Sequence, residues 1–263
     1  MEQPPPAPTG DAVVVQGLTK VFRGVAAVDH LTFSVARGRF FGFLGPNGAG
    51  KSTTIKMLTG LLRPTSGDAW IEGRPVREDP LGVKRIIGVL PEELPLYDRL
   101  TGEEYLIFAG RMHGLAPALA RSRSEELLNF LSLSDEAGKL IVDYSLGMKK
   151  KVALAAALIH DPRVLFLDEP LNGIDPVSGR VVTDLLRQLA RKGVTLFFTT
   201  HVLDVVERLC DEVAIIDHGR IVAKGTLEEI RTRREVGADA SLEDVFLKLV
   251  DAHLDRQDLS WIS

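Results

Sequence analysis

A glycine-rich stretch between two apolar segments constrains this chain more than any other feature. Residues 45–53 read Gly-Pro-Asn-Gly-Ala-Gly-Lys-Ser-Thr and fit the pattern G-x-x-x-x-G-K-S. The run at 40–44 is short and aromatic, which is typical of a buried strand, and the apolar spacing over 54–62 is helical. Strand, glycine turn and helix in this order predict a phosphate-binding loop, in which backbone N–H groups form a nest for oxyanions.

The residues of this loop have distinct expected roles. Lys51 is expected to reach the terminal phosphates, and Ser52 to offer its hydroxyl to Mg²⁺. The helix that begins there adds the positive end of its dipole. The residues expected to bind the nucleotide here are Gly45, Pro46, Asn47, Gly48, Ala49, Gly50, Lys51, Ser52 and Thr53. The alternative, a turn that merely connects a strand to a helix, is disfavoured by a second motif downstream, so we expect a nucleoside triphosphate to bind.

Composition and charge narrow the class of protein. With 263 residues, 45% hydrophobic and 26% charged, the chain is long enough for one large domain or two modest ones. A net charge of −4 does not mark the whole surface for nucleic acid or an anionic membrane. The single cysteine, Cys210, excludes an internal disulfide and fits a reducing compartment. Its apolar neighbourhood predicts a buried structural thiol.

The hydropathy pattern bears on the relation to membranes. The first residues are proline-rich and lack the basic and then apolar pattern of a signal peptide. The longest uninterrupted apolar run, 152–159, is far shorter than the roughly 18 to 20 residues that span a bilayer. We therefore expect any role at a membrane to come through a separate partner chain.

Strand-like and helical segments alternate along the chain. Strands are expected at 12–18, 30–35, 40–44, 69–71, 86–90, 164–167, 194–198, 213–216 and 221–223. From 92 to about 160 the periodicity is helical, with a capping box at 101–104, a capped helix start at 122–125 and an N-cap at Ser145. The pattern predicts a mostly parallel sheet covered on both sides, interrupted by an all-helical insertion.

The domain organisation follows from this pattern. Residues 1–10 are expected to be a disordered tail, and 11–231 to form one domain that contains the helical insertion. Residues 232–263 are expected to form a helical extension, with an amphipathic helix over 241–254. The sequence shows no internal repeat, which indicates one nucleotide-binding fold and not two.

A second motif places acids at the end of a buried strand. Residues 164–170 read Val-Leu-Phe-Leu-Asp-Glu-Pro. In an open parallel sheet such a strand end lies where ligands collect, so Asp168 is expected to hold Mg²⁺ through water. Glu169 is one residue further out and is expected to orient or deprotonate the attacking water. His201 follows the neighbouring strand and is assigned a role at the γ-phosphate.

The motifs, taken in order, resemble those of the ATP-binding subunits of ABC transporters. The resemblance runs from about residue 12 to 230, with GPNGAGKST at 45–53 and VLFLDEP at 164–170. It implies an α/β P-loop NTPase fold, a RecA-like core with an N-terminal antiparallel β portion and an inserted α-helical subdomain at about 92–160. His201 is similar to the family's switch histidine, and 171–175 to the loop between two subunits. Phe22, which spacing alone makes an ordinary strand residue, is similar to the aromatic that stacks on adenine.

Two segments depart from the family pattern. The signature LSGGQ is here Tyr-Ser-Leu-Gly-Met at 144–148, which keeps Ser145 and Gly147. In the family this segment contacts the γ-phosphate of the ATP held by the other subunit. Glu92 stands where the family usually has a glutamine that touches Mg²⁺ and water, so the resemblance makes it a metal contact that adds negative charge.

Three lysines, residues 149–151, follow the signature segment. Cations are unfavourable in the first turns of a helix because they oppose the dipole. An incoming triphosphate would relieve this repulsion; the alternative is a solvated basic face.

The resemblance implies a subunit that binds and hydrolyses ATP with Mg²⁺ and powers transport, most readily export, through a separate integral membrane permease. It implies a second copy of the chain, or a homologous subunit, closing head to tail around two ATP molecules. A cytoplasmic helix of the permease is expected to dock on 94–106, which places the chain in the cytoplasm, peripheral on the inner face of the cell membrane.

Two alternatives stay open at this point. One is a soluble ABC-type ATPase that acts on nucleic acid or ribosomes; such relatives generally carry two cassettes or a long coiled-coil insertion, which this chain lacks, and we expect no nucleic-acid partner. The other is a P-loop kinase or GTPase. The acidic strand end at Asp168 disfavours a kinase, and no Asn-Lys-x-Asp segment for reading guanine is present.

Overall fold

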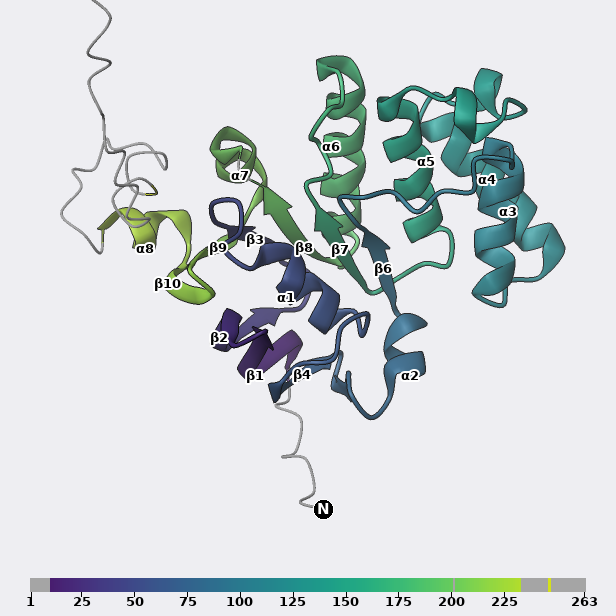
Figure 1. The fold of residues 1–263 in the computed structure, drawn as a ribbon. Coiled ribbons are helices and arrows are strands. Elements are labelled where there is room, and N and C mark those ends of the chain that lie inside the picture. The colour runs from purple at the N-terminus through teal and green to yellow at the C-terminus, as the bar shows by residue number, and fades with distance from the viewer. Residues whose placement is uncertain (1–9, 201, 233–245, 247–263) are drawn as a thin grey trace, which may run out of the picture.

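A central sheet with helices on both faces forms the core of the structure, a computed structural model that describes residues 10–200, 202–232 and 246 (Figure 1). Its strands lie in the order β10-β9-β3-β8-β7-β6. They are β3 (Phe40–Leu44), β6 (Ile87–Leu90), β7 (Val164–Asp168), β8 (Thr195–Thr200), β9 (Glu212–Asp217) and β10 (Arg220–Gly225). All neighbours pair in parallel except β10, which is antiparallel to β9. The predicted, mostly parallel sheet is therefore present.

Strand β3 shows why its sequence is apolar throughout: every residue in it is buried. Phe41 and Phe43 pack into one core cluster with α1 (Lys51–Leu58) and with a second sheet. Phe40 and Leu44 face the other cluster, which holds α5 (Leu146–Leu158), α6 (Pro176–Arg191) and α7 (Leu203–Leu209). A strand covered on both faces has no polar side, so alternation is absent from its sequence.

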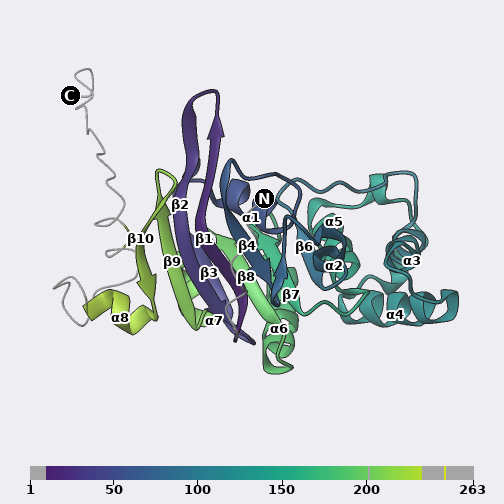
Figure 2. The ribbon, with the colours of Figure 1, turned by 90° about the horizontal axis from the view of Figure 1, so that it is seen from below.

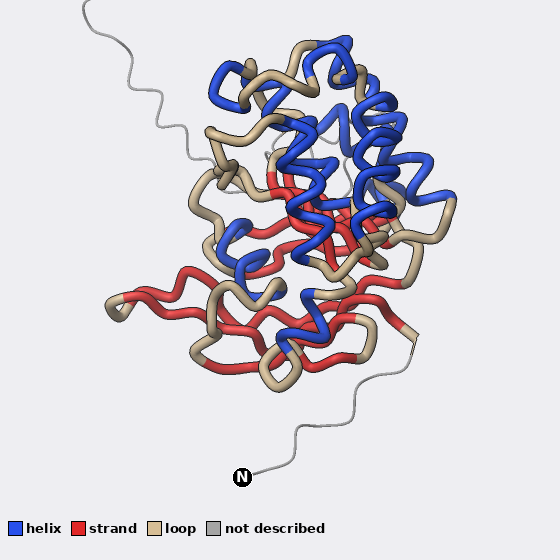
Figure 3. Tube along the Cα trace, turned by 90° about the vertical axis from the view of Figure 1, so that its right-hand side faces the viewer, coloured by secondary structure: helices blue, strands red, loops and turns tan. Residues whose placement is uncertain are grey.

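The second sheet is antiparallel and lies below the first in the view of Figure 3. It contains β1 (Asp11–Phe22), β2 (Val25–Ala36), β4 (Ser66–Ile71) and β5 (Arg74–Pro75), in the order β2-β1-β4-β5. Figure 2 shows the β1–β2 hairpin reaching beyond the central sheet. Its strands are longer than the sequence predicted, and a turn at Arg23 and Gly24 joins them.

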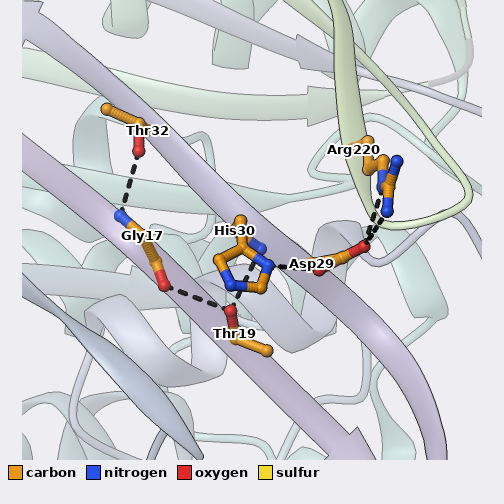
Figure 4. A network of polar contacts seen from close by, with 6 residues as sticks. All are labelled: Gly17, Thr19, Asp29, His30, Thr32 and Arg220. Atoms are coloured by element: carbon orange, nitrogen blue, oxygen red, sulfur yellow. Dashed lines mark hydrogen bonds and ion pairs between the residues drawn. The ribbon is translucent and has the colours of Figure 1, made fainter.

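A polar network joins this hairpin to the edge of the central sheet (Figure 4). Arg220, at the start of β10, donates to the carboxylate of Asp29 on β2 at 2.7 Å. The backbone N–H of Asp29 donates to the carbonyl of Gly219 at 2.9 Å, and Gly219 in turn donates to the carbonyl of Ala49 at 3.0 Å. The His30 N–H donates to the Thr19 hydroxyl across the two strands. The network therefore links the antiparallel sheet, the β9–β10 turn and the glycine loop.

The chain between β6 and β7 forms helices, on the right in Figure 1. They are α3 (Gly102–Met112), α4 (Pro117–Phe130), the 3-10 turns η1 (Ser134–Glu136) and η2 (Ile141–Asp143), and α5. The predicted capping box of Thr101 and Glu104 is present on α3, and the Ser145 hydroxyl caps α5. The predicted helix start near Ser122 is wrong. Helix α4 begins at Pro117 without a side-chain cap, because proline already has the φ of a first helical residue.

Two short helices complete the described chain, α2 (Pro80–Lys84) and α8 (Leu227–Thr232). In the part of the chain that the structure describes, no helix has both the length and the apolar character needed to cross a bilayer. The predicted tail over 1–10, apart from Gly10, and the predicted helix over 241–254, apart from Phe246, lie outside the described residues, as does His201.

Cys210 behaves as the sequence predicted. It is buried, and burial raises the pKa of its thiol well above the usual range. A Cβ added at Gly42 would lie 3.0 Å from its sulfur, so the glycine in β3 makes the room that this thiol occupies.

Candidate nucleotide site

The glycine loop lies between the carboxyl end of β3 and the start of α1, where the sequence predicted it. Two of its glycines are required by close approach of backbone. A Cβ at Gly45 would lie 2.3 Å from the Ile216 carbonyl, and one at Gly50, where φ is +109°, would lie 2.5 Å from the Ala27 carbonyl. The start of α1 has no side-chain cap, since its cap residue is Gly50. Its first N–H groups are therefore suited to a bound anion.

Lys51 is folded back over the loop. Its Nζ donates to the carbonyl oxygens of Gly45 at 2.7 Å and Pro46 at 3.1 Å. Burial lowers the pKa of Lys51, and the carboxylates of Glu169 and Asp168 oppose that shift. A cation held this way stands at the point where phosphate charge would be neutralised.

The two acids of the second motif are buried and fixed by one threonine. Asp168 and Glu169 are 4% and 5% exposed. The hydroxyl of Thr199, on β8, donates to Oδ1 of Asp168 at 2.5 Å and accepts from the backbone N–H of Glu169 at 3.2 Å. Glu169 has a φ of +48°, which is rare for a residue with a side chain and turns it out of the strand direction. The acids are thus held in different orientations at the same strand end.

A cavity of about 320 Å³ brings these groups together. Its lining residues are Ala27, Asn47, Gly48, Gly50, Lys51, Ser52, Thr53, Glu92, Asp168, Glu169 and Asn172. The loop, both acids and Glu92 therefore share one site, as the sequence predicted.

The oxygen donors of this cavity fit Mg²⁺. Ser52, Asp168 and Glu92 all line it, and they supply a hydroxyl and carboxylates. Among the described residues, no cluster of three acidic, histidine or cysteine side chains could hold a metal by itself. A hydroxyl and carboxylates from the protein suit Mg²⁺, which takes one or two carboxylates and completes its shell with phosphate oxygens and water.

The alternative of a solvated basic face at residues 149–151 is wrong for two of the three lysines. Lys150 and Lys151 are 5% and 7% exposed. The Nζ of Lys150 donates to the backbone carbonyl of Glu169 at 2.8 Å. Burial lowers the pKa of Lys150, and the carboxylates of Glu169, Glu92 and Asp168 oppose that shift. Lys149 lies 4.0 Å from the carboxylate of Asp98.

The signature-like segment lies outside this cavity. Ser145 is exposed, and its hydroxyl accepts from the Met148 N–H at 3.3 Å. Leu146, which replaces a glycine of the family pattern, lies against Gly173, since a Cβ added there would meet the leucine side chain at 2.6 Å. Gly147 is half-buried beside this contact. Neither Ser145 nor Gly147 lines the chain's own nucleotide cavity.

The remaining predicted residues differ in their placement. Gly45, Pro46 and Ala49 shape the loop without lining the cavity. Phe22 is 46% exposed near the hairpin turn, with Lys20 Nζ 5.1 Å from its ring, and it also lies outside the lining.

Sequence reasoning did not name Thr199 or Ala27 as site residues, and no local pattern marks them, because each meets the site through tertiary packing. It singled out the segments 149–151 and 171–175 but did not place Lys150 on the Glu169 main chain or Asn172 in the lining of the chain's own cavity.

A phosphate loop after β3 of a parallel sheet, with acids at the end of β7, one strand beyond the adjacent β8, defines a P-loop NTPase. The comparisons with known proteins narrow this class. A family model described as "ABC transporter" matches residues 28–172, which is more than half of the chain. The chain belongs to this family and is an ATP-binding subunit whose activity is ATP hydrolysis.

Curated relatives are similar over most of the chain. The daunorubicin/doxorubicin resistance ATP-binding protein DrrA of Streptomyces peucetius is 43% identical over 84% of this chain and 67% of its own length. The linearmycin resistance ATP-binding protein LnrL of Bacillus subtilis is 38% identical over 87% of this chain and 73% of its own.

Solved structures agree with the fold. An ATP-binding subunit of an ABC transporter aligns with a TM-score of 0.85 and 34% identity over 90% of this chain and 99% of that one. The protein cbiO1 from Clostridium perfringens, part of the transporter complex cbiONQ, aligns with a TM-score of 0.75 and 28% identity over 86% and 93%. The predicted fold, a P-loop core with an antiparallel β portion and inserted helices, is confirmed.

Proposed function

We propose that this chain hydrolyses ATP as the motor of an exporter, together with a separate integral membrane permease. The observation that carries the proposal is the single cavity in which Lys51, Asp168 and Glu169 meet the glycine loop. Relatives named as ATP-binding proteins for resistance to daunorubicin and linearmycin support a role in export. The alternative, an ATPase that acts on nucleic acid or ribosomes, is not favoured by these relatives.

The chain's own residues divide the work of hydrolysis. The loop N–H groups and Lys51 bind the phosphates and stabilise negative charge on them. Ser52, Asp168 and Glu92 would hold Mg²⁺, and the ion would supply positive charge beside the phosphate oxygens. The Glu169 carboxylate orients the attacking water and accepts its proton. His201 stays assigned to the γ-phosphate, and Phe22 to stacking on the adenine.

The position of the signature segment supports action between two copies. Ser145 and Gly147 lie outside the lining of the chain's own cavity, and Ser145 is the exposed N-cap of α5, at a helix start whose N–H groups can bind an anion. We propose that these groups bind the γ-phosphate of ATP on a second copy, so that two chains close head to tail around two nucleotides.

An apolar groove supports a permease contact on the same face as the predicted 94–106 segment. The groove encloses about 350 Å³ and is lined by Pro95, Leu96, Tyr105, Phe108 and Met112, among others. Met112 is 71% exposed and Phe108 is 40% exposed. Exposed apolar side chains around a concave surface are typical of a partner site, and we assign it to a cytoplasmic helix of the permease. This contact would hold the chain at the inner membrane face.

The Glu169→Gln variant tests the proposal. We expect hydrolysis to fall at least about 100-fold, because an amide cannot accept the proton of the water. Binding of MgATP should persist, and the ATP-bound dimer should accumulate in size-exclusion chromatography. Daunorubicin efflux from cells that carry the chain and its permease should stop as well. Glu93→Gln, at an exposed acid outside the cavity, is the matched control. Unchanged hydrolysis in the Glu169 variant would remove the assignment of the base.

A further inference from the structure

Lys150 connects two parts of the molecule that are separate in sequence. It lies in the first turns of α5, five residues after Ser145, in the helical segment between β6 and β7. Its buried Nζ donates to the carbonyl of Glu169, at the end of β7. The helix that begins at the signature segment therefore holds the main chain of the residue that we assign as the base.

The peptide groups on both sides of Glu169 are fixed. Its N–H lies 3.2 Å from the Thr199 carbonyl oxygen, which accepts from it. Its own carbonyl accepts from Lys150 at 2.8 Å and from the Asn172 N–H at 3.3 Å. A residue with a side chain keeps a left-handed conformation only where its surroundings enforce it. These contacts, together with the hydrogen bond from the Glu169 N–H to the Thr199 hydroxyl, fix the main chain from which the Glu169 carboxylate projects.

The positive charge of Lys150 also affects the electrostatics of the site. The cavity contains three carboxylates, those of Glu92, Asp168 and Glu169, and Lys51 as their lining cation. The same three carboxylates act on Lys150, whose Nζ lies 2.8 Å from the Glu169 carbonyl oxygen, and they oppose the lowering of its pKa by burial. A buried ammonium group is stable only with such partners. Lys150 therefore offsets negative charge beside the place where phosphates bind, including the charge that Glu92 adds.

We propose that Lys150 is a positioning residue for ATP hydrolysis, which aims the Glu169 carboxylate through its backbone and balances the charge of Glu92. This inference rests on the proposed function, because it takes Glu169 as the base. It also gives a route between sites. A second copy's nucleotide that binds at Ser145 would shift the start of α5, and Lys150 would transmit that shift to Glu169 of its own site.

The first test compares steady-state hydrolysis of MgATP by full-length variants. Lys150→Met keeps the length of the side chain but removes its charge and donor groups. We expect kcat to fall at least about tenfold while KM changes less than about threefold, because the base is misplaced and nucleotide binding is not. Lys150→Arg should keep kcat within about threefold of wild type. Lys139→Met, the same change at an exposed lysine that pairs with Glu136 outside the cavity, should leave both constants unchanged.

A double-mutant cycle tests the charge balance. The fold-loss of kcat caused by Lys150→Met should be at least about threefold smaller in a Glu92→Gln background than in the wild type, because one carboxylate is gone. If Lys150→Met does not fold, as judged by circular dichroism, Lys150→Gln takes its place in both tests.

Three results would overturn the inference: an unchanged kcat, a rise in KM alone, or an equal loss in Lys139→Met. If the wild type hydrolyses ATP normally and substitution of Lys150 does not change the rate, only this inference is contradicted. Hydrolysis that survives Glu169→Gln contradicts the proposed function instead.

Discussion

The phosphate loop and the segment around Ser145 both place N–H groups at the start of a helix, yet their surroundings differ. The loop is enclosed by its own chain: Gly45 and Gly50 touch neighbouring carbonyls, and Lys51 is 7% exposed. Ser145 is exposed. Within the described part of the chain, its hydroxyl forms no hydrogen bond with an acid or a lysine of the nucleotide cavity. The phosphate loop forms its part of a nucleotide site within its own chain. The Ser145 segment, in contrast, needs a nucleotide that another molecule holds. Substitutions in the two regions should therefore change different properties of the protein.

The largest effect should come from Gly50→Ala in the enclosed region. The new Cβ would overlap the Ala27 carbonyl at 2.5 Å, and φ is +109°. We expect the free energy of unfolding, measured without nucleotide by urea denaturation, to fall by about 3 kcal/mol. ATP binding should be lost. Gly48→Ala is the matched control, because φ is +81° there but no atom lies within 4 Å, and it should cost about 1 kcal/mol. An equal loss of unfolding free energy in both variants would show that close packing at Gly50 does not determine the conformation of this loop.

An intermediate effect is expected at the exposed region. Ser145→Ala removes the cap of α5 and should lower the free energy of unfolding by about 1 kcal/mol. Hydrolysis should fall by about tenfold, because a contact to charged phosphate oxygens is lost, while binding of ATP to the monomer is unchanged. Thr101→Ala removes the cap of α3 and is the control: it should lower stability similarly and leave hydrolysis alone. A weaker monomer affinity in Ser145→Ala would mean that the serine serves its own site.

The smallest effect is expected away from both regions, where β6 meets the helical segment. His160 stacks on His113 of the helical segment, with ring centroids 3.6 Å apart, and its Nε2 donates to the Ile87 carbonyl on β6 at 2.9 Å. Burial, and then the charge of His113, lowers the pKa of His160 to about 4.

The sign of the pH effect follows from this lowered pKa. Because an unfolded histidine titrates near 6.5, the unfolded state binds more protons between pH 6.5 and 4. The stabilisation is complete above pH 6.5 and is lost as pH falls towards 4. We expect the melting temperature of wild type to drop more steeply over this range than that of His160→Gln. Parallel curves would show that His160 is not held neutral.

Much of the fold could be predicted from sequence, and the reason lies in local pattern. The strand at 40–44, the glycine loop and the strand that ends at Asp168 each carry their signal in a few consecutive residues. Caps at Thr101 and Ser145 were also predicted, since a cap is decided within four residues. The start of α4 was not, because Pro117 begins that helix without a capping side chain.

The site was predicted only in part. The motifs named Lys51, Ser52, Asp168 and Glu169, which the cavity brings together. The environment of Lys150 could not be predicted, because a run of three lysines is usually solvated. Its burial results from α5 packing against the end of β7, 19 residues further along the chain.

By itself, the amino-acid sequence determined which chemical groups this protein has for binding phosphate, because loop, strand and helix signals are local and in a specific order. Only the tertiary structure decided how the acids are aimed. Thr199 reaches Asp168 across 31 residues of sequence, and Lys150 reaches the main chain of Glu169 from a different part of the fold. Such contacts depend on how sheet and helices pack, and packing sums many weak interactions that no short pattern contains.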